Sequence, residues 1–183
     1  IMADKIKVSV FWFRRDLRLE DNHGLSQALQ SQYPVLPLFI FDTKITKPLP
    51  QDDARITFIH QNLTALNKVL AKHGSGIFIA KDAPQQAWKN LLHRFEIQEV
   101  YFNEDYEPYA IHRDKQITTM LKKSGVQVHT TQDHLIFAKN QILKNDNTPY
   151  TVYTPYKNKW LQQFKESNIK PYASKAFKSF IKR

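Results

Sequence analysis

The chain has 183 residues, enough for one domain with a complete hydrophobic core, and its apolar share of 42% is ordinary for a soluble globular protein. It contains no cysteine, which excludes disulfides and cysteine-ligated zinc and is compatible with the cytoplasm. No apolar run approaches the ~20 residues of a membrane span, and the first residues lack the apolar stretch of a secretion signal. We therefore expect a cytoplasmic protein without membrane contacts.

The net charge of +10 is distributed unevenly along the chain. Residues 1–138 carry 17 lysines and arginines against 15 acidic residues, whereas residues 139–183 carry 10 against 2. The body is thus nearly neutral, and the positive charge lies at the C-terminal end. A basic terminal run is more often a solvated linker than a nucleic-acid contact, and both interpretations stay open at this point.

The first predicted element is a buried strand at Val8–Phe13. It ends at Arg14 and Arg15, in a turn that carries charges of both signs. Asn22, or the residue before it, can then cap a helix from about His23 to Gln30. Because this turn contains no glycine, any ligand bound there must be held by side chains rather than by bare backbone amides.

The next part of the chain continues the alternation of strands and helices. Further strands are predicted at Val35–Phe41, Gly76–Ala80, Glu99–Asn103 and Val126–Thr130, and helices at about 53–74, from residue 84, and at 109–124. Pro37 is awkward inside the second strand, because proline cannot donate to the ladder and is typical of an edge or a strand start. The alternation predicts an α/β fold: a doubly wound, Rossmann-like, five-stranded parallel sheet with helices on both faces.

The pattern changes after about residue 134. Residues 135–153 suggest a small irregular or hairpin excursion, and Thr154 followed by Pro155 indicates the start of another helix. Residues 168–183 contain five basic residues and no acidic one. We therefore divide the chain into an α/β domain at 1–134, an excursion and closing helix of the same domain at 135–167, and a basic connector at 168–183.

Polar side chains gather where open parallel sheets bind ligands, outside the carboxyl ends of the strands at the point where strand order reverses. If strands one to three spread one way and four and five the other, this point lies between the turns Arg14–Arg18 and Asn103–Glu107. Phe41 and Asp42, at the end of the second strand, lie beside the first turn. These groups could enclose a planar ligand with polar edges, or, about equally well, merely pair with one another.

The sequence carries no signal of catalysis or of a metal site. It contains no GxGxxG, GxxxxGK[ST] or GxSxG motif, and its seven histidines lack metal-ligand spacing. The residues alone therefore predict a ligand-binding α/β domain with no catalytic residue and no metal.

Four stretches at sensible spacing carry a resemblance that covers about Val8 to Phe164. They are FWFRRDLRLEDN, VLPLFIFD, VYFNEDYEPYAIHRD and PYTVYTPYKNKWL. Together they strongly resemble the N-terminal domain of the DNA photolyase/cryptochrome family. The resemblance implies a five-stranded α/β domain that binds a light-harvesting antenna chromophore, followed in the family by a helical domain that binds FAD and damaged DNA.

The resemblance also implies an activity for the parent protein. In the family, photoexcited reduced FAD donates an electron to a cyclobutane pyrimidine dimer flipped out of DNA. Nothing here matches the helical domain, so we expect an inactive, monomeric fragment of a deoxyribodipyrimidine photo-lyase that meets DNA and FAD only through that further domain. The RRDLR stretch is similar to class I cyclobutane-dimer photolyases. A cryptochrome photoreceptor is the alternative, and a stand-alone nucleotide-binding domain is a more distant one.

The antenna chromophore is expected to be a deazaflavin or a flavin rather than a folate. Folate-binding members carry an Asn-Glu pair after the fourth strand, where this chain has Tyr109 and Ala110. By resemblance, the cofactor contacts are assigned to Arg14, Arg15, Phe41, Asp42, Asn103, Asp105 and Glu107.

Overall fold

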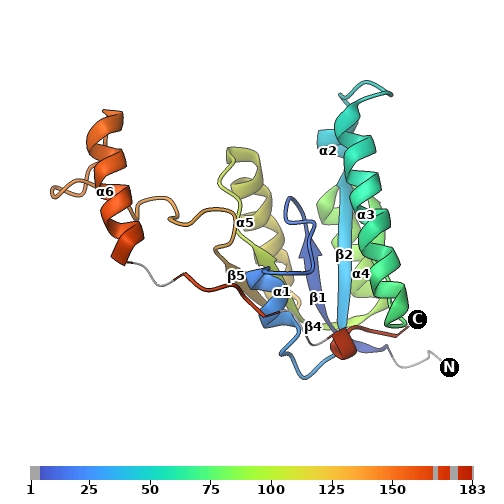
Figure 1. Cartoon of the computed structure of the whole chain (residues 1–183). Coiled ribbons are helices and arrows are strands. Elements are labelled where there is room, and N and C mark those ends of the chain that lie inside the picture. Colours follow the sequence, from blue (N-terminus) through green and yellow to red (C-terminus); the bar gives the residue numbers. More distant parts are fainter. Residues whose placement is uncertain (1–4, 167–168, 174–176, 183) are drawn as a thin grey trace. The chain divides into compact units, whose positions relative to one another are not determined.

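A computed structural model describes residues 5–166, 169–173 and 177–182 (Figure 1). The strands are β1 (Lys7–Phe13), β2 (Val35–Asp42), β3 (Phe78–Asp82), β4 (Glu96–Asn103) and β5 (Gln127–Thr131). The helices are α1 (His23–Ala28), α2 (Thr43–Thr46), α3 (Ala54–Lys72), α4 (Pro84–Arg94), α5 (Pro108–Lys123) and α6 (Tyr153–Glu166), and a 3-10 turn, η1, lies at Phe177–Ser179.

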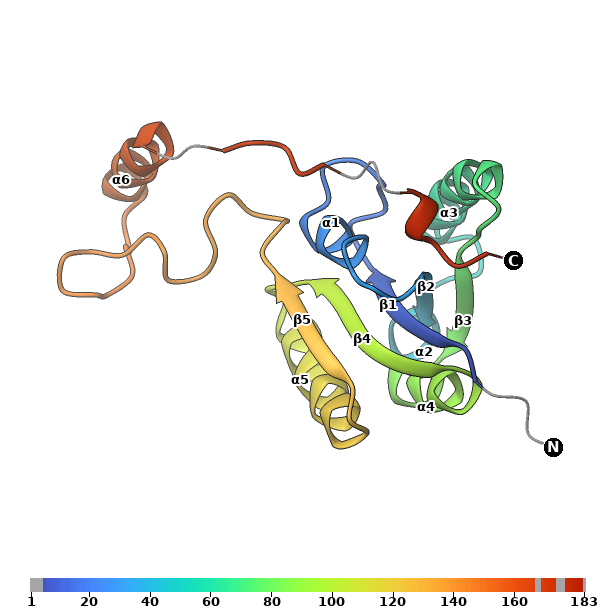
Figure 2. The ribbon, with the colours of Figure 1, turned by 90° about the horizontal axis from the view of Figure 1, so that it is seen from below.

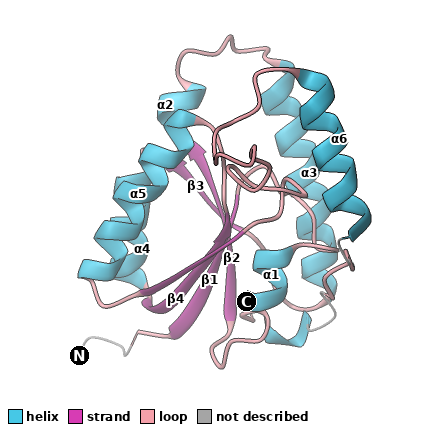
Figure 3. Cartoon of the chain, turned by 90° about the vertical axis from the view of Figure 1, so that its left-hand side faces the viewer, coloured by secondary structure: helices cyan, strands magenta, loops and turns pink. Residues whose placement is uncertain are grey.

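The five strands form one parallel sheet in the order β3-β2-β1-β4-β5. Figure 2 shows α4 and α5 on one face of this sheet and α1 and α3 on the other, and Figure 3 shows the same two layers edge-on. The predicted doubly wound α/β fold is therefore confirmed. The strand order reverses between β1 and β4, as the sequence analysis expected, so the carboxyl ends of these two strands flank the switch point.

Pro37 lies in an inner strand rather than at an edge of the sheet, because β2 pairs with both β1 and β3. On the β1 side it is aligned with Phe11. On the other side, pairing with β3 begins only at Leu38. Pro37 thus lies before the stretch of β2 that pairs with β3, so no hydrogen bond to β3 requires the N–H that proline lacks. This explains how an inner strand tolerates the proline.

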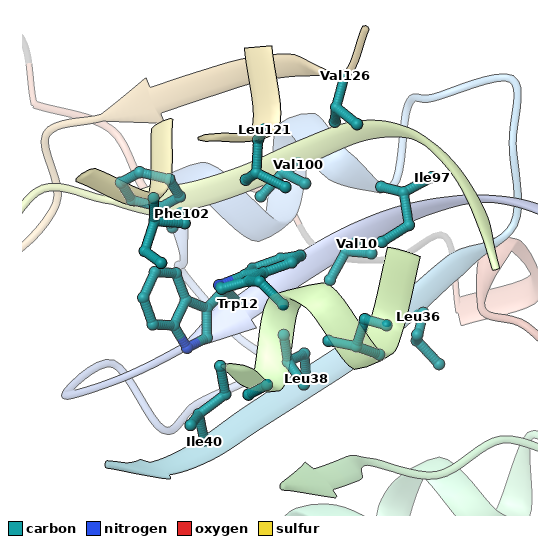
Figure 4. Close-up of a cluster of buried hydrophobic side chains, with 14 of the residues drawn as sticks. Val10, Trp12, Leu36, Leu38, Ile40, Ile97, Val100, Phe102, Leu121 and Val126 are labelled. Atoms are coloured by element: carbon teal, nitrogen blue, oxygen red, sulfur yellow. The ribbon is translucent and has the colours of Figure 1, made fainter. Parts of the chain in front are cut away.

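Buried aromatic and aliphatic side chains fill the layer between the sheet and the helices α4 and α5 (Figure 4). The ring of Trp12 lies edge-on to Trp88 at 5.6 Å and to Phe102 at 5.7 Å. Such aromatic pairs contribute about 0.5–1.5 kcal/mol beyond the area that they bury. This packing fixes the ends of β1 and β4, and with them the polar turns that follow.

The opposite face of the sheet has its own core, which includes a residue from the end of the chain. Phe180 is buried with Phe11, Leu63 and Leu70. It forms a bridge to Val35, and the backbone N–H of the next residue donates to the carbonyl oxygen of Val35 at 2.9 Å. The sequence analysis, which treated residues 168–183 as a connector, did not predict this packing.

The chain divides into two compact units, residues 1–133 with 172–183, and residues 134–171. In the second unit, the described residues before α6 form turns and no strand, so the excursion is irregular rather than a hairpin. The ring of Trp160 contacts Phe137 at 5.4 Å and Phe164 at 5.1 Å. Among the described residues, no helix is long and apolar enough to cross a membrane.

Gly24, in the first turn of α1, lies close to residues of β1, β4 and β5. A methyl group there would meet Asn103 Oδ1 at 2.8 Å, Thr131 Oγ1 at 2.9 Å and the Phe11 ring at 3.0 Å. Glycine to alanine in an open helix gains about 1 kcal/mol, whereas overpacking costs about 1–3 kcal/mol. We expect Gly24→Ala to lower the free energy of unfolding by up to about 2 kcal/mol in urea titrations, the overpacking cost less the helix gain; a stabilised variant would contradict this.

Candidate functional site

The turn after β1 is built around the buried carboxylate of Asp16. Its Oδ1 accepts a hydrogen bond from the backbone N–H of Arg14 at 2.8 Å, and its Oδ2 accepts from the side-chain amides of Asn22 and Asn103. Asn22 in turn caps α1, because its Oδ1 accepts from the N–H of Leu25 at 3.1 Å. These bonds hold the turn in place through its side chains.

Asn103, one of the predicted contacts, belongs to this network and is not among the residues that line the pocket described below. Its Oδ1 accepts from the N–H of Gly24 at 2.9 Å and from the hydroxyl of Thr131 at 2.6 Å. Its Nδ2 donates to Asn22 Oδ1 at 2.9 Å as well as to Asp16. The Asn103 side chain therefore joins β4, β5 and the turn after β1, and it stabilises the turn without lining the pocket.

A pocket of about 240 Å³ lies at the carboxyl ends of β1 and β2 and beside the turn after β4. Six of the seven predicted contacts line it: Arg14, Arg15, Phe41, Asp42, Asp105 and Glu107. The structure thus brings together turns that are up to about 90 residues apart in the sequence. This is the position where a doubly wound sheet binds ligands.

Other lining residues were missed by the sequence analysis. Trp12 both packs in the core and borders the pocket, and Ile45 and Ile59 come from α2 and α3. Tyr109 and Arg113 come from the first two turns of α5. Their i, i+4 spacing is the one signal that could have indicated a shared helix face.

Arg15 connects the two turns across the switch point. Its Nε lies 3.2 Å from Asp105 Oδ2, and its Nη2 lies 2.5 Å from Glu107 Oε1. The hydrogen bond to Glu107 is the main reason why the pKa of Arg15 is raised. Asp105 is only 5% exposed, whereas Arg15 is 46% exposed, so water screens the outer half of this pair. The sequence analysis left open whether these charged groups pair with one another or surround a ligand. In the structure they pair, and the same residues line the pocket.

Arg14 directs its guanidinium inward. Its Nη1 contacts Asp114, and its Nη2 donates to the backbone oxygen of Asn103. The guanidinium carbon lies 4.7 Å from the ring centroid of Phe102 and 5.2 Å from that of Trp12. Its side chain is 7% exposed. Arg14 therefore lines the pocket, but its guanidinium is mainly engaged in structural bonds to Asp114 and Asn103.

Asp42 and Tyr109 join the end of β2 to the start of α5. The Tyr109 hydroxyl donates to Asp42 Oδ2 at 2.6 Å, while Asp42 Oδ1 accepts from the N–H of Lys44 and caps α2. Burial, together with this bond to a carboxylate, raises the pKa of Tyr109. The phenol therefore stays protonated with its single O–H donated to Asp42, and Tyr109 lines one side of the pocket.

The site is suited to holding a flat molecule. Aromatic and aliphatic side chains form most of its walls, with guanidinium, phenol and carboxylate groups placed among them. In the part of the chain that the structure describes, no group of three or more histidine, aspartate or glutamate side chains could hold a metal ion.

Comparison with known sequences identifies relatives across most of the chain. The family model for DNA photolyase matches residues 9–176. The deoxyribodipyrimidine photo-lyase of a Synechococcus species is 32% identical over 87% of this chain and 33% of its own length. Cryptochrome-2 of Gallus gallus is 30% identical over 79% of this chain and 25% of its own.

Solved structures agree with these matches. A class III photolyase from Agrobacterium tumefaciens aligns with a TM-score of 0.75 and 27% identity over 93% of this chain and 34% of its own. An archaeal photolyase from Sulfolobus tokodaii, which contains two FAD molecules, aligns with a TM-score of 0.64 and 31% identity over 73% and 32%. The chain thus spans about a third of the length of these relatives.

Proposed function

Because this chain belongs to the DNA photolyase/cryptochrome family, we propose that it is the N-terminal, antenna-binding domain of a deoxyribodipyrimidine photo-lyase. In this proposal the full-length protein is a cytoplasmic monomer that repairs pyrimidine dimers in DNA with FAD held in a further, helical domain. This chain absorbs light and passes the excitation energy to that FAD. None of its residues is assigned a catalytic role, and alone it is inactive in repair.

The observation that carries the proposal is the pocket at the switch point of a sheet that aligns with those of photolyases. An antenna must be a conjugated, planar molecule, and this pocket combines aromatic walls with polar groups at defined places. A flavin or a deazaflavin is the ligand class proposed. The Sulfolobus tokodaii relative contains two FAD molecules, which imply a novel light-harvesting cofactor in that protein. This supports a flavin over a deazaflavin.

A folate fits the site less well. Tyr109 and Ala110 stand where folate-binding relatives are expected to carry an Asn-Glu pair, and the Tyr109 hydroxyl already donates to Asp42. Ala110 is buried and has no polar side-chain atom. The proposal therefore includes no folate.

The role of the paired charges is tested by flavin and deazaflavin titrations followed by absorbance. Replacing both Arg15 and Asp105 by alanine removes the ion pair between the two turns, so we expect at least a tenfold weaker affinity, in line with the ~1.5–3 kcal/mol of a charged hydrogen bond. The matched control is the double alanine variant of Lys7 and Glu96, an exposed ion pair of 3.7 Å at the first residues of β1 and β4, the opposite end of these strands from the pocket. Unchanged binding in the Arg15/Asp105 variant would contradict the assignment.

A cryptochrome is the second candidate, favoured by the 30% identity to Cryptochrome-2 of Gallus gallus. Both candidates share this domain. A repair assay of the full-length protein on DNA that contains pyrimidine dimers separates them, because only a photo-lyase restores the pyrimidines under light.

A further inference from the structure

Arg113, which the sequence analysis did not single out, lies in the second turn of α5 and lines the pocket. Its side chain is only 9% exposed. The guanidinium carbon lies 5.1 Å from the ring centroid of Trp12 and 5.8 Å from that of Tyr109. A guanidinium that rests on aromatic faces is held in position without using up its N–H donors.

The donors of Arg113 are incompletely satisfied. Nε donates to Asp114 Oδ1 at 3.0 Å, while Nη2 lies 3.0 Å from the same oxygen but without hydrogen-bond geometry. Nη1 makes no hydrogen bond to any residue within 5–166, 169–173 or 177–182. Asp114 also forms an ion pair with Arg14, so a single carboxylate pairs with two buried guanidinium groups. Buried polar groups are normally paired, so this shortage of acceptors points to a ligand that supplies one.

We propose that Arg113 donates to the acceptor edge of the planar ring held in the pocket, the edge where flavins and deazaflavins carry their carbonyl oxygens and ring nitrogen. The inference rests on the proposed function and adds the group that orients the ring. A ring carbonyl is a suitable partner because it accepts a hydrogen bond while its uncharged ring packs against Trp12 and Tyr109.

The size of the pocket argues against the other acceptor of a flavin nucleotide, its phosphate. The pocket volume of about 240 Å³ lies below the ~300–1,000 Å³ of typical ligand sites, so it encloses a ring system but not also a phosphorylated side chain. Charge does not decide the matter, because the three carboxylates of the lining face four guanidinium groups, and two of those carboxylates, Asp105 and Glu107, already pair with Arg15. The ring therefore enters the pocket, and the phosphate stays outside.

The test is a titration of the purified protein with lumiflavin, riboflavin and FMN, which share the ring but differ in the side chain and the phosphate. Arg113→Met is expected to weaken all three by the same factor, about tenfold or more, because a charged hydrogen bond is lost. The visible absorption band of the bound ring should also shift relative to the wild type. Arg94→Met is the control, since Arg94 stacks on Phe78 and Phe95 outside the pocket.

Each outcome decides the proposal. If Arg113→Met weakens only FMN, the arginine binds the phosphate and the proposal is wrong; if it weakens none of the three ligands, the arginine is not an anchor. If the wild type binds no ring ligand, this inference fails together with the proposed function, which distinguishes that failure from the other two. Circular dichroism verifies folding, and Arg113→Lys, which keeps the charge but not the planar fork, replaces the methionine variant if that one does not fold.

Discussion

Asp114→Asn is expected to lower the free energy of unfolding by about 3–5 kcal/mol, the cost of leaving buried charges without their counter-ion. Asp114 Oδ2 contacts Arg14 and its Oδ1 contacts Arg113, so one carboxylate compensates two guanidinium groups. The three side chains are 14%, 7% and 9% exposed, so water screens them little. Asparagine preserves the volume and one acceptor but removes the charge.

Urea unfolding measures this loss, and a second ion pair supplies the control. Asp53 caps α3 and pairs with Arg55 at 2.6 Å, but Arg55 is 70% exposed. Asparagine is an equally good helix cap, so Asp53→Asn should leave stability nearly unchanged. Equal stabilities of the two asparagine variants would refute the expectation.

A double variant tests whether the surplus charge is the cause. If Asp114→Asn destabilises because a guanidinium is left unpaired, adding Arg113→Met removes one of the two affected groups. The combined loss should then be smaller than the sum of the two single losses, by about 1 kcal/mol or more for groups in direct contact. Strict additivity would indicate that the two residues act independently.

The parallel sheet and its switch point could be predicted because they follow from alternating apolar runs and helical periods. The bounds of β1, β2 and β5 were predicted to within one residue, but the bounds of β3 and the start of β4 were not. β4 begins at Glu96, three residues before the predicted start at Glu99, since backbone pairing with Lys7 and Val8 continues beyond the apolar run. Strand ends depend on the partner strand, which a single segment of sequence does not contain.

The sequence could predict those pocket residues that are charged and lie just after a strand. Arg15 and Asp105 each lie two residues after the end of their strand, β1 and β4, so the topology brings them together. The direction of a side chain depends on packing instead. Asn103 stands at the end of β4 but turns toward Asp16, and Arg113 faces the pocket only because of the way α5 lies on the sheet. Four-residue α2, which adds Ile45, is too short to show a period.

Asp16→Asn is expected to lower the free energy of unfolding by about 2–4 kcal/mol, although the two side chains have nearly the same shape. The carboxylate accepts on both oxygens, from the Arg14 N–H on one side and from the amides of Asn22 and Asn103 on the other. An asparagine amide presents N–H groups on one of these sides, whichever way it is turned. At least one buried donor then loses its acceptor, at about 1–3 kcal/mol.

Relaxation cannot remove this conflict cheaply. Turning the Asn22 amide would offer the introduced amide an acceptor only by giving up the cap of α1, worth about 1 kcal/mol, and the bond from Asn103. Urea unfolding and flavin titration should therefore both report the change, since the same turn positions Arg15 at the pocket. Glu20→Gln, an exposed carboxylate in the same turn, should stay within about 0.5 kcal/mol of the wild type. If Asp16→Asn behaved like that control, the buried network would be a consequence of the turn's conformation rather than its cause.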